Sequence, residues 1–140
     1  MGNHVIEIGN GERYKGDVVD GKKHGKGRYW FASGNRYEGH FENDVIEGKG
    51  RFFFSNGNKY EGDFHNGKME GKGTFTTPEG IKYEGDFVND NFEGEGKLKI
   101  KNGPTYEGGF KAGKKNGHGV QKNPDGSKQE GEWKDDEFQG

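Results

Sequence analysis

The sequence predicts an all-β protein: an elongated single-layer antiparallel sheet of consecutive β-hairpins, with about twelve strands. A 23-residue unit recurs along the chain without insertion, which is typical of repeat architectures. Within each unit, residue types alternate with period two, which indicates strands and does not fit helical spacing. Only 25% of the 140 residues are hydrophobic and 29 are glycine, so a thick central core is not expected.

The overall composition narrows the class of protein. Low hydrophobicity with 33% charged residues would suggest disorder, but the 14% aromatic content argues for a folded chain. The formal net charge is −2, from 22 basic and 24 acidic residues, so we expect no nucleic-acid partner. The absence of cysteine excludes disulfides, thiolate metal sites and cysteine nucleophiles.

A tyrosine column sets the register of the repeat. Its members are Tyr14, Tyr37, Tyr60, Tyr83, Tyr106 and then Gln129. Glycine follows two residues later in every copy. Four residues after the anchor stand Val18, Phe41, Phe64, Phe87, Phe110 and Trp133. Each unit therefore opens with a Tyr-Glu-Gly-x-aromatic pattern, from which Val18 and Gln129 depart.

Two strands are predicted in each unit, strand A at Tyr37–Phe41 and strand B at Gly50–Phe54 in the second copy. The short connection from B to the next A contains Ser33-Gly34-Asn35 or its counterparts, which are residues that favour hairpin turns. A longer loop is expected from A back to B. That loop would hold the column Ile46, Met69 and Phe92.

The turn length decides which residues face one another. A three-residue turn, or a five-residue turn of the same parity, sets each large ring against another ring or a glycine. The predicted pairs are Phe31 with Tyr37, Tyr29 with Gly39, and Gly27 with Phe41. The same register predicts polar pairs on the other face: Asp63 with Arg51, Glu107 with Lys99, and Glu130 with Lys122.

The repeat also predicts the domain organisation. Val5-Ile6-Glu7-Ile8 falls where a B strand belongs, and Asn10-Gly11 falls at the tight turn. Gly140 falls just after an A strand. We therefore predict that residues 1–140 form one repeat domain of six B-turn-A hairpins.

The pattern Tyr-Glu-Gly-x-Phe/Trp, an Asn/Asp-Gly turn and then Gly-Lys-Gly-x-Phe resembles the MORN repeat, and the resemblance covers essentially the whole chain. It implies a twisted single-layer sheet with a groove lined by the repeat aromatics. Members of this family are similar to non-enzymatic scaffolds at cytoskeletal or ciliary structures or membrane junctions. Several bind a partner helix or peptide in the groove, and several dimerise through an end.

The resemblance implies a protein-binding groove, with a helix or an extended peptide as the partner. The expected groove residues are Tyr37, Phe41, Phe52, Tyr60, Phe64, Phe75, Tyr83, Phe87, Tyr106 and Phe110. No enzyme activity, cofactor or metal site is expected, because the five histidines occupy different repeat columns without paired metal spacing. The loop Gly16 to Lys22 has phosphate-loop spacing but lacks the Ser or Thr that would follow Lys22.

Two adjacent rings stand apart from the repeat pattern. Trp30 and Phe53 belong to a column otherwise occupied by Glu, Thr and Lys, so they are expected on the polar face of the sheet. They form a candidate contact patch. The alternative is that local twist or a strand end covers them.

An alternative function is targeting to phosphoinositides or anionic membranes, a ligand class also proposed for the family that the chain resembles. The candidate lipid-binding residues are Lys97, Lys99, Lys101, Lys111, Lys114 and Lys115. Unpaired end strands and alternating charge blocks also suggest an end-to-end homodimer. The expected location is cytoplasmic, at cytoskeletal or ciliary structures or as a peripheral membrane protein.

Overall fold

The computed structural model describes residues 3–140, which contain thirteen β-strands and no helix. This confirms the all-β prediction. Within that range there is accordingly no helix long and apolar enough to cross a membrane. The described residues form two compact units, one ending at Lys68 and the other beginning at Met69. The assignment of residues 1–140 to a single domain stays a prediction.

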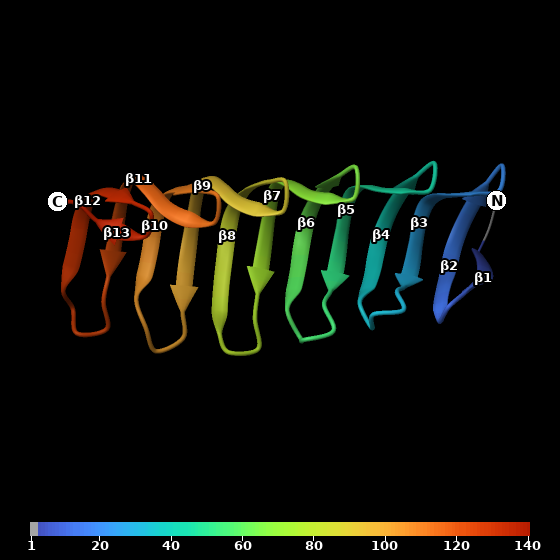
Figure 1. The fold of residues 1–140 in the computed structure, drawn as a ribbon, viewed down its shortest axis with the longest axis horizontal. Coiled ribbons are helices and arrows are strands. Elements are labelled where there is room, and N and C mark those ends of the chain that lie inside the picture. The colour runs from blue at the N-terminus through green and yellow to red at the C-terminus, as the bar shows by residue number, and fades with distance from the viewer. Residues whose placement is uncertain (1–2) are drawn as a thin grey trace. The chain divides into compact units, whose positions relative to one another are not determined.

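The first unit is one antiparallel layer, coloured blue to green in Figure 1. Each strand pairs with the next one along the chain. The strands are β1 (Asn3–Gly9), β2 (Glu12–Val19), β3 (Lys22–Trp30), β4 (Arg36–Glu42), β5 (Val45–Phe53) and β6 (Lys59–His65). As predicted, residues 5–8 lie in a strand that precedes a tight turn at Asn10-Gly11.

The second unit repeats this arrangement, with consecutive antiparallel pairs from β7 to β13. Its strands are β7 (Lys68–Thr76), β8 (Ile81–Val88), β9 (Asn91–Ile100), β10 (Thr105–Lys111), β11 (Lys114–Lys122), β12 (Lys128–Lys134) and β13 (Glu137–Phe138). The last strand has only two residues and adds a thirteenth to the predicted twelve.

The expected long loop between an A strand and the following B strand does not exist. Strand β5 begins at Val45 and not at Gly50, so only Asn43 and Asp44 separate it from β4. Both residues have positive φ, 47° and 72°, the backbone of a two-residue hairpin turn that Asn and Asp tolerate. The placement of Ile46, Met69 and Phe92 in loops was therefore wrong: they lie in β5, β7 and β9.

The other connection has five residues, 31–35, which is the second of the two turn lengths predicted from the sequence. The pairs predicted for a three-residue turn are therefore shifted by two residues. The Phe31 N–H donates to the Asn35 carbonyl at 2.9 Å, so both residues belong to the turn. Tyr29 consequently faces Tyr37, and Gly27 faces Gly39.

The predicted polar pairs change with this shift. Asp63 pairs with Lys49 at 2.5 Å, and Arg51 pairs with Glu61 at 3.0 Å. In the second unit, Glu107 lies opposite Lys97, and Glu130 lies opposite Val120. The three predicted pairs were therefore wrong by two residues, although each carboxylate lies on the predicted face.

The core is built from tyrosine rings that lie on glycine pairs. Tyr37 is fully buried, and its ring covers Gly39 on its own strand and Gly50 on the next. Its hydroxyl donates to the His40 carbonyl at 2.9 Å. The same bond to the carbonyl three residues later recurs at Tyr14, Tyr60, Tyr83 and Tyr106. Both glycine columns recur in every repeat because each tyrosine ring needs backbone without a side chain beneath it.

Phenylalanines join these tyrosines into a continuous row within each unit. Phe41 meets Tyr37 edge-on at 5.2 Å between ring centroids, and it meets Tyr14 of the preceding hairpin at 5.3 Å. Phe64 bridges Tyr37 and Tyr60 in the same way. Such edge-to-face contacts contribute about 0.5–1.5 kcal/mol each beyond burial. The core is thus a row of contacting rings that lies on paired glycines, which we call the glycine floor.

We predict that Gly50→Ala destabilises the protein by about 1–3 kcal/mol, the usual cost of overpacking a core. A Cβ at Gly50 would lie 2.6 Å from the Cζ of Tyr37, which is closer than real contacts allow. Urea unfolding monitored by circular dichroism measures the change.

The matched control is Gly67→Asp. Gly67 has φ 79° and no neighbour within 4 Å of an added Cβ. The equivalent Asp44 and Asp90 adopt φ of 72° and 70°, and each accepts a backbone N–H from an earlier strand at 2.8 Å. Gly67→Asp should therefore leave stability unchanged or raise it. Equal losses in both variants would contradict the role assigned to the glycine floor.

We also predict loss of stability in alkali. Burial raises the pKa of Tyr14 and of Tyr29 to about 12, and it raises the pKa of Tyr37 and Tyr83 as well. Because the folded state holds these protons more tightly than the unfolded chain, their contribution is complete below pH ~10 and is lost as pH rises toward ~12. Urea unfolding at a series of pH values measures this. Tyrosinate absorbance that titrates near pH ~10 without unfolding would contradict it.

Candidate interaction surfaces

The structure places most of the predicted groove residues inside the core. Their exposed fractions are 5% or less, so their rings are covered by neighbouring rings and backbone. The buried residues are Tyr37, Phe41, Tyr60, Phe64, Tyr83, Phe87, Tyr106 and Phe110. Phe52 and Phe75 are half-buried and present part of their rings at the surface. A contact role for the predicted groove residues stays a prediction. Phe52 and Phe75 are the better candidates for contact, because they are the least buried.

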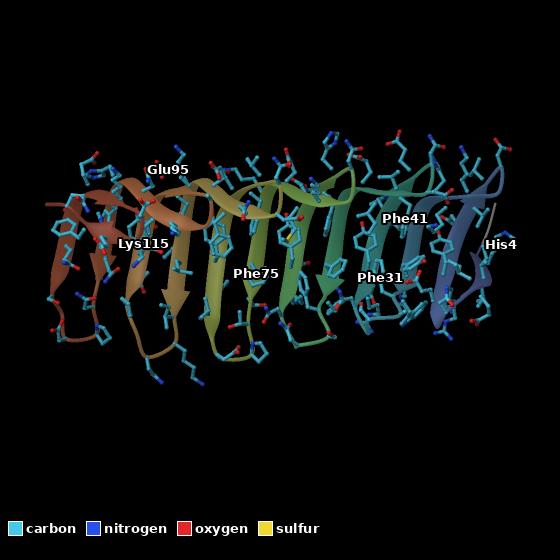
Figure 2. The ribbon with its side chains drawn as sticks, in the orientation of Figure 1. His4, Phe31, Phe41, Phe75, Glu95 and Lys115 are labelled. Atoms are coloured by element: carbon cyan, nitrogen blue, oxygen red, sulfur yellow. The ribbon has the colours of Figure 1, made fainter. Side chains whose placement is uncertain are left out.

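In the first unit, four half-buried rings form a connected row that we call the aromatic ladder: Tyr29, Phe31, Phe52 and Phe54. Ring centroids are 4.7 Å apart from Tyr29 to Phe31, 5.6 Å from Phe31 to Phe52, and 4.7 Å from Phe52 to Phe54. Phe31, labelled in Figure 2, lies toward the B-to-A turns, away from the buried Phe41. Of these rings, only Phe52 belongs to the groove residues predicted from the sequence.

One edge of the aromatic ladder is charged. The Tyr29 hydroxyl donates to Glu12, and this bond together with the Ala32 N–H lowers the pKa of the Glu12 carboxyl. The Lys23 Nζ lies 5.4 Å from the Tyr29 ring centroid and pairs with Asp44 at 3.3 Å. The first hairpin therefore gives the ladder one polar end.

In the second unit the corresponding face turns from apolar to polar. Leu98 and Ile100 are half-buried on β9, but Gln121 on β11 and Asn123 just after it occupy the equivalent positions and hydrogen-bond to each other at 3.0 Å. The Lys115 ammonium donates to Gln121 at 2.6 Å and lies 5.0 Å from the Trp133 ring. Partial burial lowers the pKa of Lys115.

Trp30 and Phe53 lie on the polar face, in a row of alternating cations and rings. The Arg13 guanidinium lies 4.2 Å from the centroid of Trp30, and the Arg36 guanidinium lies 4.3 Å from that of Phe53. Lys59 approaches Phe53 from the next strand at 6.0 Å. Such contacts contribute about 0.5–1 kcal/mol at exposed sites. The two rings are half-buried under these neighbours, so their role as a contact patch stays a prediction.

The six lysines predicted to bind lipid do not share one surface. Lys99 lies on β9 opposite Thr105, whereas Lys111 lies six residues farther along β10, roughly 20 Å of strand away. Lys114 lies opposite Lys111, at the far end of the hairpin. Lys97 has Glu84 and Glu107 as its cross-strand neighbours, and Lys101 lies in a turn. Lys115 lies against the aromatic core.

Across residues 3–140, no group of three His, Asp or Glu side chains is arranged to hold a metal ion. His65 pairs with Glu47 at 2.8 Å, and His118 pairs with Glu132 at 3.7 Å. Each of these pairs joins two neighbouring strands.

The chain resembles solved structures at low sequence identity. A comparison with curated protein sequences finds no match. Among solved structures, the TCP domain of SAS-4 from Drosophila melanogaster, in complex with a proline-rich motif of Ana2, aligns with 90% of this chain and 81% of that chain. The identity is 12% and the TM-score is 0.46. A likeness of this size carries no information about function.

The family comparison is specific. The model described as the MORN repeat matches residues 14–36, 37–59, 60–82, 83–105, 106–128 and 130–140. The first five segments are complete 23-residue units, and the sixth covers 11 residues of the next unit. The tyrosine and glycine columns of these units build the core. The MORN repeat is a non-catalytic repeat module. The chain therefore belongs to the MORN repeat family.

Proposed function

We propose that the protein is a non-enzymatic scaffold whose aromatic ladder binds an apolar segment of a protein partner. The observation that carries the proposal is the half-exposed row Tyr29, Phe31, Phe52 and Phe54. The aromatic rings of the A strands are buried in the core. The aromatic ladder therefore provides the aromatic surface that folding leaves partly exposed. Rigid aromatic side chains supply large contact areas at low entropic cost and dominate many protein interfaces.

The spacing of the aromatic ladder favours a helix as the bound segment. The two ring pairs lie at the ends of β3 and β5, each with one ring on the strand and one just after it. These strands are separated by two strand spacings, or roughly 10 Å. Residues i and i+7 of an α-helix are separated by about 10.5 Å along its axis. An amphipathic helix lying across the strands could therefore set one apolar residue against each ring pair.

The membrane-targeting alternative has weaker support. The six lysines are distributed over both faces and both ends of the hairpins, and Lys97 lies between carboxylates. Anionic lipid binding, a cytoskeletal or ciliary location and a peripheral membrane location remain proposals that rest on the family resemblance. A homodimer formed through an end would involve β1, on which Val5 is 62% exposed and Ile8 is 46% exposed.

The test uses substitutions that the chain itself carries at equivalent positions. Phe31→Asn copies Asn123, and Phe52→Gln copies Gln121, so both should fold. We expect the double variant to lose crosslinks to partner segments that the wild-type chain forms in a cell extract, as read by crosslinking mass spectrometry. The wild-type crosslinks should map beside the aromatic ladder, on apolar residues spaced as in a helix.

The matched control is Phe53→Thr, which copies Thr76 and removes a ring from the opposite face. It should keep the crosslinks. Retention of the same crosslinks by a folded Phe31→Asn, Phe52→Gln variant would sink the proposal. Equal loss in Phe53→Thr would also sink it, because the effect would not belong to the aromatic ladder.

A further inference from the structure

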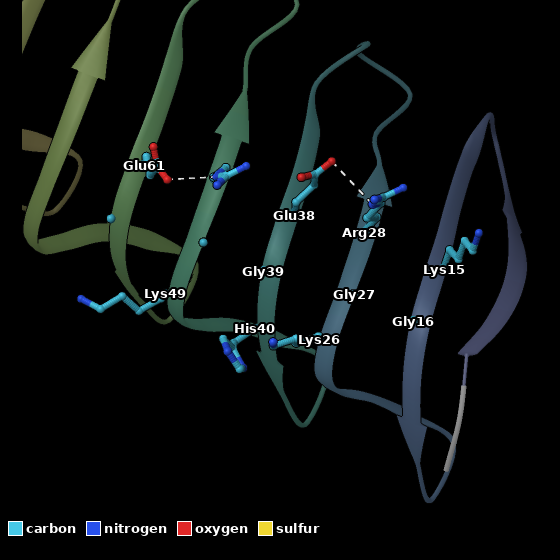
Figure 3. Close-up of a pocket in the computed structure, with 13 residues that line it drawn as sticks. Lys15, Gly16, Lys26, Gly27, Arg28, Glu38, Gly39, His40, Lys49 and Glu61 are labelled. Carbon is cyan, nitrogen blue, oxygen red and sulfur yellow. Dashed lines mark hydrogen bonds and ion pairs between the residues drawn. The ribbon is translucent and has the colours of Figure 1, made fainter.

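The polar face of the first unit contains an open cavity of about 700 Å³, on the side of the sheet opposite the tyrosine rings (Figure 3). Its lining residues come from five consecutive strands, β2 to β6. Glycines such as Gly27, Gly39 and Gly50 form its floor, because the rings that cover them lie on the other side. The cavity therefore lies over backbone that the core keeps free of side chains.

The walls of this cavity are mainly cationic. Its charged lining comprises Lys15, Lys26, Arg28, Lys49 and Arg51, against Glu38 and Glu61. Glu38 already pairs with Arg28 at 3.5 Å, and Glu61 pairs with Arg51 at 3.0 Å. Lys49 pairs with Asp63 at 2.5 Å. The surplus positive charge therefore resides at the β2–β3 end, on Lys15 and Lys26.

Comparison among the repeats shows why this end lacks carboxylates. The column of Lys15 otherwise contains only glutamate: Glu38, Glu61, Glu84, Glu107 and Glu130. The column of His40 otherwise contains Asp17, Asp63, Asp86, Gly109 and Glu132. These two departures remove two carboxylates from one cavity.

The departures create contacts that do not favour folding. Lys15 lies directly opposite Arg28, and like charges opposite each other destabilise a sheet. Lys26 lies opposite His40, whereas Lys49 at the equivalent position pairs with Asp63. Within residues 3–140, neither Lys15 nor Lys26 has an ion-pair partner within 4 Å. An external anion would take the place of the two carboxylates that are absent at these positions.

We infer that this cavity, the cationic cavity, binds an acidic segment of a protein partner, with Lys15 and Lys26 pairing its anionic groups and Arg28 and His40 flanking them. Five strands span roughly 19 Å, which is the length of about six residues of extended peptide. The carboxylates of Glu38 and Glu61 at the other end would repel a continuous polyanion. A peptide can place acidic residues at one end and neutral or basic residues at the other.

The equivalent surface of the second unit has the opposite character. There a cavity of about 420 Å³ is lined by Glu84, Glu95 and Glu107, with Lys97 as its lysine. The repeat architecture therefore provides the hollow in both units, and the substituted columns decide its charge. An acidic segment is accordingly specific to the first unit.

The inference is tested by fluorescence anisotropy at low ionic strength, with the intact chain and a labelled probe peptide of three glutamates followed by three serines. We expect binding that weakens with salt and that drops at least about tenfold in Lys15→Glu, His40→Asp. These substitutions restore the residues of the other repeats, so the thermal midpoint should not fall. Lys111→Glu makes the same charge change as Lys15→Glu at an exposed site in the second unit, and it should bind as the wild type does.

Three results would overturn the inference: no binding of the probe peptide at low salt, equal weakening by Lys111→Glu, or Lys15-dependent binding of phosphatidylserine vesicles or single-stranded DNA without peptide binding. The Phe31→Asn, Phe52→Gln variant should bind the probe peptide normally, because its substitutions lie on the opposite face. The experiments therefore distinguish a failure of the proposed acidic-segment site in the cationic cavity from a failure of the proposed binding by the aromatic ladder.

Discussion

The contact of a tyrosine ring with a pair of glycines is the interaction on which this protein depends. Each ring lies flat on two strands, and its hydroxyl satisfies a carbonyl three residues later. That arrangement needs no second layer, which is why a chain with 25% hydrophobic residues can form a buried core. The phenylalanines then connect one hairpin to the next edge-on.

The same interaction decides which surfaces remain for binding. Rings over glycine are buried in the core, so aromatic contact surface is left to the ends of the B strands and the turns that follow, as at Phe52 and Phe31. On the reverse side, the bare glycine backbone leaves a hollow whose walls are set by residues such as Lys15 and His40. Structural columns therefore fix the shape of the protein, and the columns that vary between repeats adjust its chemistry.

Much of the fold could be predicted from the sequence. The Tyr and Gly columns predicted the strands, their order and the faces of Asp63 and Arg51 correctly. Of the two predicted turn lengths, the five-residue one is present: Phe31 looks like a strand residue, yet its N–H closes the turn with Asn35. The two-residue turn at Asn43-Asp44 was missed because neither residue is glycine, although the equivalent Asn66-Gly67 carries that hairpin signal. Of the candidate sites, the aromatic columns were recognised, but their burial depends on packing between hairpins that a single repeat does not show.

Nuclear magnetic resonance tests the central claim, that tyrosine rings lie on glycine backbone in every complete repeat. The ring of Tyr37 should show nuclear Overhauser contacts to the Hα protons of Gly39 and Gly50, and these protons should be shifted upfield by the ring current. The same pattern should recur for Tyr83 with Gly85 and Gly96. Glycine Hα protons at random-coil shifts, without contacts to the tyrosine rings, would contradict the account.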